Sequence, residues 1–173
     1  SSNKEALLRK ASVKLPDKEK LIKLEKLSRS QGSGIELDSL IGDWKIVSVW
    51  KKDRDEEDTV FTSLLRIFSA NIKYKKDVSI DDFAKFSIIT SIQFGLFTIE
   101  FSGSGLLKEK QTLLPFFFKR IEFKTGSNIL FSRSLEEPEE KKKPFFALIA
   151  LEENGKWLSA RGYGGAILIL LKD

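Results

Sequence analysis

The stretch SLIGDWKIVSVW, residues 39–50, decides the fold because its period is that of a β-strand. Gly42 lets the chain turn tightly into the strand. Along WKIVSVW, alternate side chains point to the same side, so Trp44, Ile46 and Trp50 are predicted to share one face. From this point on, the chain follows an alternating rather than a helical pattern.

The same alternation recurs to the end of the chain, in KFSIITSIQF (85–94), FTIEF (97–101), FKRIEF (118–123), NILFSRSL (128–135), PFFALIAL (144–151) and GGAILILL (164–171). Turn signals separate these runs, and Asn154-Gly155 is a strong hairpin signal. GSGLLKEKQ (103–111) predicts a plain loop. The spacing of eight to ten short strands favours an antiparallel barrel or sandwich, since no alternation of helix and strand suggests a parallel sheet. We expect a mainly β protein built as an antiparallel barrel.

Residues 4–30 are predicted to be helical, and Leu7, Leu8 and Ala11 recur at helical spacing in the first part. The apolar residues of DKEKLIKLEKLSRS (17–30) recur at helical spacing, and Pro16 suits the first turn of a helix. QGSG (31–34) ends it. The chain therefore divides into a helical segment, 1–34, and a β-barrel domain, 35–173. The helix either flanks the barrel or rests its basic face on an anionic lipid surface.

Composition argues against catalysis. The chain has no Cys and no His, which removes thiolate metal sites, disulfides and the commonest general base. Acidic runs such as DRDEED (53–58) read as solvated loops. The net charge of +5 comes from 30 basic and 25 acidic residues without a concentrated basic-aromatic face, so nucleic acid is not an expected partner. We expect no catalytic residue, metal or cofactor.

Arg161 stands among glycines just before the last apolar run, in RGYGGAILILL (161–171). In an up-and-down barrel the first and last strands pair, because this pairing removes the sheet edges. We therefore predict that Arg161 lies over the ring of Trp44 and, with Gly42, closes the barrel. Such a cation–π contact contributes about 0.5–2 kcal/mol. The alternative is an arginine that binds a ligand.

Several apolar residues of the alternating runs are candidates to line the barrel interior. They either fill a core or line a pocket for an apolar ligand, and the pattern leaves both open. The candidates are Ile46, Trp50, Phe86, Ile88, Phe97 and Ile99, with Arg133 or Tyr163 at a polar end.

Two short segments resemble the plastid lipid-associated protein (PAP)/fibrillin family of plastids and cyanobacteria. The residues that match are Leu40, Gly42, Trp44, Ile46 and Val47 in the opening strand, and Arg161, Gly162, Gly165, Ile167 and Leu168 near the end. Ser48 departs from the tyrosine that the family has there. The resemblance implies a lipocalin-like barrel that binds or scaffolds apolar lipids, pigments or quinones without catalysis. It also implies a location at thylakoids or plastoglobules, or in the cyanobacterial cytoplasm or at its thylakoid surface.

Two other functions stay open. One is a protein-interaction module, in which a filled barrel docks an acidic partner protein through its basic surface. The other is a lipocalin-type bilin lyase, which needs an acidic residue inside the cavity, supplied by Glu100 or Glu122. The sequence does not indicate an oligomeric state.

Overall fold

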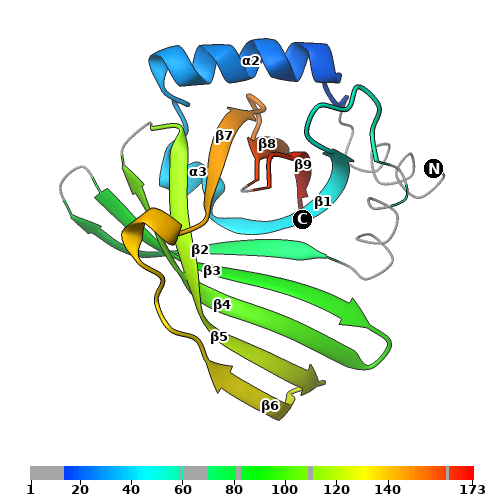
Figure 1. Cartoon of the computed structure of the whole chain (residues 1–173), viewed down its shortest axis with the longest axis vertical. Coiled ribbons are helices and arrows are strands. Elements are labelled where there is room, and N and C mark those ends of the chain that lie inside the picture. Colours follow the sequence, from blue (N-terminus) through cyan, green and yellow to red (C-terminus); the bar gives the residue numbers. More distant parts are fainter. Residues whose placement is uncertain (1–13, 59, 61–69, 81–82, 109–110, 163) are drawn as a thin grey trace.

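The computed structural model describes residues 14–58, 60, 70–80, 83–108, 111–162 and 164–173. Within these residues the chain is mainly β, with one antiparallel sheet of nine strands and a helix lying across it (Figure 1). The strands are β1 (Gly42–Trp50), β2 (Asn71–Ile80), β3 (Phe83–Phe94), β4 (Phe97–Lys108), β5 (Leu113–Thr125), β6 (Asn128–Ser134), β7 (Phe145–Leu151), β8 (Trp157–Arg161) and β9 (Ile167–Lys172). The helices are α2 (Lys18–Gln31), α3 (Leu37–Leu40) and the short 3-10 helix η1 (Glu140–Lys142).

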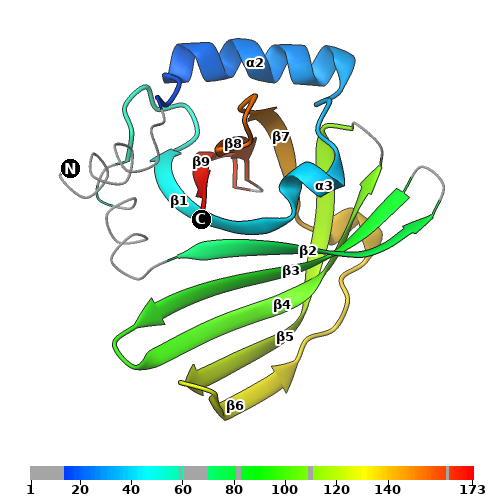
Figure 2. The same cartoon turned by 180° about the vertical axis from the view of Figure 1, so that it is seen from behind.

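Eight of the strands form a closed ring. The sheet order is β4-β3-β2-β1-β9-β8-β7-β5-β6, and an additional β4–β5 pairing joins the ends of the ring and leaves β6 outside it. The predicted pairing of the first and last strands is confirmed, because Trp44 opposes Lys172 and Trp50 opposes Ile167. Figure 2 shows the ring from behind, with α2 across its outer side.

Helix α2 begins at an Asp17 cap, whose side chain accepts a hydrogen bond of 2.8 Å from the Lys20 backbone N–H. Its buried residues are Leu21, Glu25 and Ser28, spaced so that they share one face. Leu27 is half-exposed, so the apolar residues of the sequence pattern do not all face the sheet. The helix flanks the ring with a face that is partly polar.

A β-bulge in β1 changes the predicted face of Trp50. Ile46 opposes Leu170, but the next opposed residue is Ser48, which leaves Val47 as an extra residue. One extra residue turns every later side chain to the other face. Trp50 therefore packs outside the ring in a cluster with Leu21 of α2, and its predicted place on the face of Trp44 is wrong.

The interior of the ring is packed with side chains. A side chain that bordered a hollow would expose surface to water, yet the central ones are at most 3% exposed. These are Trp44, Tyr74, Phe86, Ile88, Leu114, Leu148, Leu158 and Leu170. Ile35, Leu37 and Leu40 join the same cluster from the segment around α3. At these positions the choice between pocket and core is decided in favour of a core.

The segment 103–108 is the end of strand β4 rather than the predicted loop. Its glycines are required by close approach of the neighbouring chain. A Cβ on Gly103 would lie 1.9 Å from the Phe117 carbonyl oxygen, and one on Gly105 would lie 2.2 Å from the Phe86 ring. Because only glycine fits these places, the glycines mark a tight strand crossing that resembles a loop signal in the sequence.

Candidate functional site

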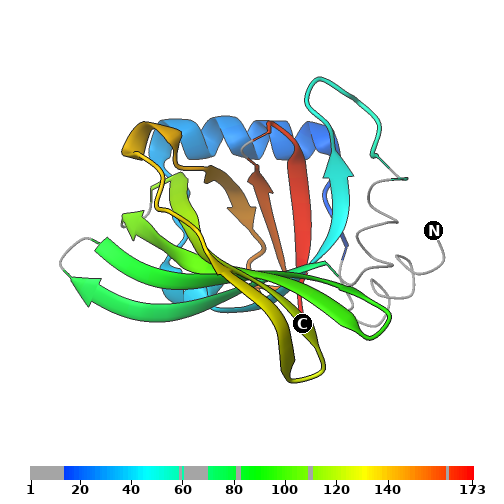
Figure 3. The same cartoon turned by 60° about the horizontal axis from the view of Figure 1, so that its bottom comes forward.

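Strands β3, β4 and β5 continue beyond the ring and, with β6, form a projecting sheet (Figures 1 and 3). Strand β5 has two successive neighbours on one side. Its residues 113–115 pair with β7, and its residues 120–125 pair with β6. Figure 3 shows the β5–β6 hairpin pointing away from α2.

One face of the projecting sheet is mainly apolar. Opposed residues of antiparallel strands lie on the same face. The regular β3–β4 register continues the interior face of Phe86 and Ile88 outward to Phe94, which opposes Phe97. We call the outward part the aromatic face; its apolar residues are Ile92, Phe94, Phe97, Ile99, Phe101, Ile121, Phe123 and Phe131. Its polar residues are Thr90, Thr125, Asn128 and Arg133.

The rings of the aromatic face contact one another but stay partly open to solvent. The centroid of Phe97 lies 5.9 Å from that of Phe94 and 5.3 Å from that of Phe123, against which it stacks. Phe97 is 40% exposed and Phe131 is 55% exposed. Aromatic contacts of this kind stabilise the face, and its exposed rings leave apolar area available to a ligand.

The opposite face of the projecting sheet is polar. Lys124 Nζ lies 3.1 Å from a Glu100 carboxylate oxygen and 3.8 Å from one of Glu122. Both carboxylates therefore face away from the phenylalanines and from the ring interior. The placement that a bilin lyase requires of Glu100 or Glu122, inside a cavity, is wrong.

Apolar side chains also crowd the tips of the two hairpins. Leu96, in the two-residue turn between β3 and β4, is 81% exposed. Ile129 and Leu130, just after the β5–β6 turn, are 55% and 54% exposed. Gly95 and Gly126 take positive φ in these turns (58° and 59°), as tight hairpins need. The tips of both hairpins are therefore apolar, although Ile129 opposes Lys124 and so lies on the polar face.

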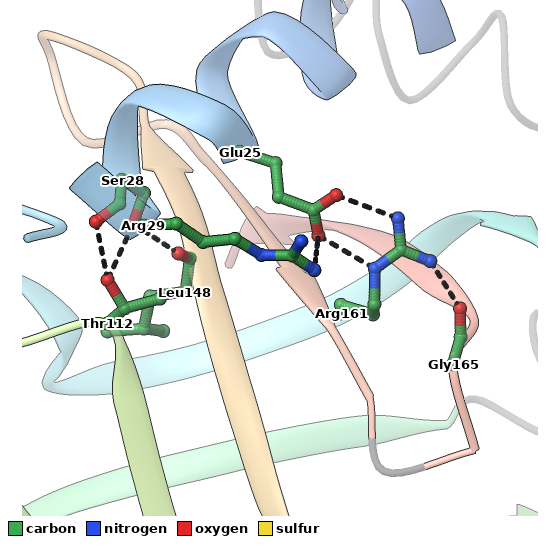
Figure 4. Close-up of polar contacts among 7 residues, drawn as sticks. All are labelled: Glu25, Ser28, Arg29, Thr112, Leu148, Arg161 and Gly165. Atoms are coloured by element: carbon green, nitrogen blue, oxygen red, sulfur yellow. Dashed lines mark hydrogen bonds and ion pairs between the residues drawn. The ribbon is translucent and has the colours of Figure 1, made fainter.

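Arg161 does not meet Trp44, and the predicted cation–π closure is wrong. Its Nε and Nη2 donate to Glu25 of α2 at 2.7 and 2.9 Å, and its Nη1 donates to the Gly165 carbonyl at 2.6 Å (Figure 4). Instead, the Lys172 ammonium lies 5.6 Å from the centroid of the Trp44 ring. The Trp44 indole N–H donates to the Leu40 carbonyl at 2.8 Å.

The strand register explains this difference. Arg161 opposes Ile167 at the start of β9, whereas Trp44 opposes Lys172 at its end. With a rise of about 3.3 Å per residue, these places are roughly 16 Å apart. The pairing of the first and last strands therefore brings Lys172, at the end of β9, to Trp44, and it leaves Arg161 near the start of β9.

The Glu25–Arg161 pair is part of a polar seam beneath α2. The Ser28 hydroxyl donates to the Leu148 carbonyl at 2.8 Å, and the Thr112 hydroxyl donates to the Ser28 carbonyl at 2.7 Å (Figure 4). Hydrogen bonds from Arg161 hold the pKa of Glu25 below its ordinary value, although burial acts in the opposite direction. The seam anchors the helix to β5, β7 and β8.

A hollow of about 900 Å³ lies beside this seam. It is lined by polar residues of α2 and the adjoining loops, among them Arg29, Lys52 and Gln111, with Leu113 and Ala147 from the sheet. Its central arginine, Arg161, already pairs with Glu25. The arrangement therefore serves to hold the helix.

A second hollow, of about 580 Å³, lies on the outer side of β4 and β5. Leu106, Phe117 and Leu135 line it. Lys143 lies 4.8 Å from the Phe117 ring centroid and pairs with Glu140 at 2.7 Å. The charge of Lys143 is thus neutralised within the protein.

The structure places the candidate lining residues that it describes in three groups. Phe86 and Ile88 belong to the interior cluster of the ring, against which the partly buried Ile46 packs, and Trp50 belongs to the cluster outside the ring. Phe97 and Ile99 lie on the aromatic face, and Arg133 shares that face because it opposes Ile121. Tyr163 lies outside the described residues. Gly42 has a φ of 136° where the chain enters β1, next to the Lys172 side chain.

Reasoning from sequence missed Glu25, Phe123 and Phe131. The spacing of Leu21, Glu25 and Ser28 is a helical face, and a carboxylate on it indicates a buried cation partner, for which Arg161 was available. FKRIEF and NILFSRSL were recognised as strands, but the pattern could not show that they leave the ring.

This chain matches no family model, no curated protein and no solved structure. The resemblance to the PAP/fibrillin family therefore stays a prediction based on the two motifs. In the described part of the chain, no helix combines the length and apolarity that crossing a membrane requires. Nor does any cluster of three or more His, Cys, Asp or Glu residues within that part suit a metal ion.

Proposed function

We propose that the protein binds apolar molecules (lipids, pigments or quinones) on the aromatic face of the projecting sheet, without catalysing a reaction on them. The observation that carries the proposal is an aromatic face left partly exposed beyond a packed ring, with Phe97 at 40% and Phe131 at 55% exposure. Soluble monomers rarely keep contiguous exposed apolar patches unless these bind something.

The site is open rather than enclosed. A lipocalin-like barrel, as the family resemblance implies, would hold its ligand inside, but the central side chains of this ring are at most 3% exposed. An open face between hairpin tips that expose Leu96 and Leu130 fits an acyl or isoprenoid chain, or the surface of a lipid droplet or membrane. Apolar contact contributes about 25 cal/mol per Å² of buried area. A location at a photosynthetic membrane or plastoglobule belongs to the same proposal.

A second function is supported by the packed ring, which leaves the outer surface as the place for binding. This is the interaction module for an acidic partner protein, and it predicts association that weakens with salt. Bilin-lyase activity has no such support, because Glu100 and Glu122 pair with Lys124 on the polar face.

The direct test is flotation of the purified chain with triolein droplets that are coated with phospholipid of no net charge. The variant Phe97→Ser/Phe131→Ser removes the two most exposed rings of the aromatic face. Its matched control is Leu27→Ser/Leu113→Ser, which removes two leucines of 50% and 52% exposure that lie elsewhere. We expect roughly tenfold weaker binding for the first variant only. Equal binding by all three proteins would contradict the proposal, as would absence of binding by the unaltered chain.

A further inference from the structure

Strand β6 has a neighbour on one side only among the described strands. It pairs with β5, from Arg120 opposite Ser134 to Thr125 opposite Asn128, and it ends the order of the sheet. All seven of its residues are exposed, and Figure 1 shows it as the outermost strand. A free strand edge presents backbone N–H and C=O groups in a row that another strand can pair with.

This edge carries little protection against pairing. Proteins usually guard an edge with proline, inward charges, a very short strand or a bulge. The sequence NILFSRS contains no proline and one charge, Arg133, and three successive apolar residues, Ile129 to Phe131, are 54–55% exposed. Of these protective features, β6 has only a bulge, at Leu130. Regular pairing is thus available from Phe131 to Ser134.

The charge around the edge selects the partner. The β5–β6 hairpin holds four cations and one carboxylate, a net charge of +3. Among the described residues, Lys119, Arg120 and Arg133 form no ion pair, although Arg120 donates to the Ser132 hydroxyl at 2.7 Å. A second copy of this chain would bring the same positive charge to the edge. An acidic partner is complementary to it.

We propose that β6 binds an extended, acidic segment of another protein, which adds to the sheet as a further antiparallel strand. In that direction, the acidic end of the segment lies beside Arg133 and Arg120, and its apolar end covers Ile129 and Leu130. Main-chain hydrogen bonds supply affinity, and the charges and apolar contacts supply specificity. The inference differs from lipid binding because it uses the backbone edge of β6, although Phe131 and Arg133 of that strand share the aromatic face.

The test uses the full chain and a fluorescent synthetic peptide with two acidic residues followed by alternating valine and threonine. Fluorescence anisotropy reports binding, and a copy of the peptide with methylated backbone nitrogens keeps the side chains but cannot pair as a strand. We expect binding that weakens with salt, that falls roughly tenfold in Arg133→Glu, and that is lost with the methylated peptide. Amide hydrogen exchange should slow in β6. Peptide binding by Phe97→Ser/Phe131→Ser should still weaken with salt and still depend on Arg133, even where the affinity of this variant for the peptide is lower.

Three outcomes would overturn the inference. One is equal affinity of the methylated and unmethylated peptides, and another is equal affinity of Arg133→Glu and the unaltered chain. The third is a result in which the peptide does not bind, whereas anionic phospholipid vesicles bind the unaltered chain but not the Arg133→Glu variant. That result would assign the cations to lipid headgroups. The flotation assay with neutral droplets is unaffected by any of these, so the two proposals fail separately.

Discussion

Arg161 of β8 and Glu25 of α2, 136 residues apart in the chain, form a two-point ion pair with N–O distances of 2.7 and 2.9 Å. The Glu25 side chain is 8% exposed and that of Arg161 is 22% exposed. A planar guanidinium that meets a carboxylate in this way fixes both distance and direction. The pair therefore sets where the N-terminal helix lies on the ring.

Replacing Arg161 by Leu should lower the free energy of unfolding by about 3 kcal/mol, because it leaves the Glu25 carboxylate buried without its main partner. Arg29→Leu is the matched control, since Arg29 reaches Glu25 only at 3.7 Å and is 64% exposed; we expect a loss below about 0.5 kcal/mol. Urea denaturation measures both. Equal losses in the two variants would argue against the ion pair as the anchor of α2.

The same pair should make stability depend on pH. The pKa of Glu25 is lowered from 4.5, first by the hydrogen bonds from Arg161, so the unfolded chain takes up a proton at a higher pH than the folded one. The stabilisation is complete above about pH 4.5 and is lost as the pH falls through the lower folded pKa. The free-energy difference between the unaltered chain and Glu25→Gln should therefore shrink below about pH 4.5. A constant difference down to about pH 3 would rule the linkage out.

The sequence predicted the β class, the antiparallel order, the β1–β9 pairing and the helix at residues 17–30, because each depends on a local period or a turn signal. It failed at Trp50, because a bulge at Val47 changes the face and leaves no mark in the alternation. It failed at Arg161, because a register difference of a few residues separates Arg161 from Trp44. The aromatic face was hidden, because a strand pattern does not tell where a strand leaves the ring.

Gly103→Ala should disrupt the β4–β5 pairing that closes the ring. The added Cβ would meet the Phe117 carbonyl oxygen at 1.9 Å, so backbone must move, and we expect a loss of about 2–4 kcal/mol in the free energy of unfolding. Gly164→Ala is the control, because nothing lies within 4 Å of its added Cβ. Thermal unfolding distinguishes them, and a melting temperature for Gly103→Ala like that of the control would show that the strands do not cross so closely.

Trp44 and Lys172 should contribute unequally to stability. Trp44→Phe loses the hydrogen bond to the Leu40 carbonyl and opens space in the packed ring, so we expect about 2 kcal/mol of destabilisation. Lys172→Met keeps the apolar stem and removes only the charge over the ring, which at an exposed site is worth about 0.5 kcal/mol. Denaturant titration of both variants measures the ratio. A larger effect of the lysine would mean that the charge, rather than the packing, secures this end of the ring.

The most direct test of the central claim is to locate a bound apolar molecule by photo-crosslinking. A long-chain fatty acid that carries a diazirine is added to the purified chain, irradiated, and its adducts are mapped by mass spectrometry. We expect adducts in the strands of the aromatic face, at residues 94–101 and 121–131, and their loss in Phe97→Ser/Phe131→Ser. Adducts on Trp44, Leu158 or Leu170 would instead place the molecule inside the ring and contradict the account.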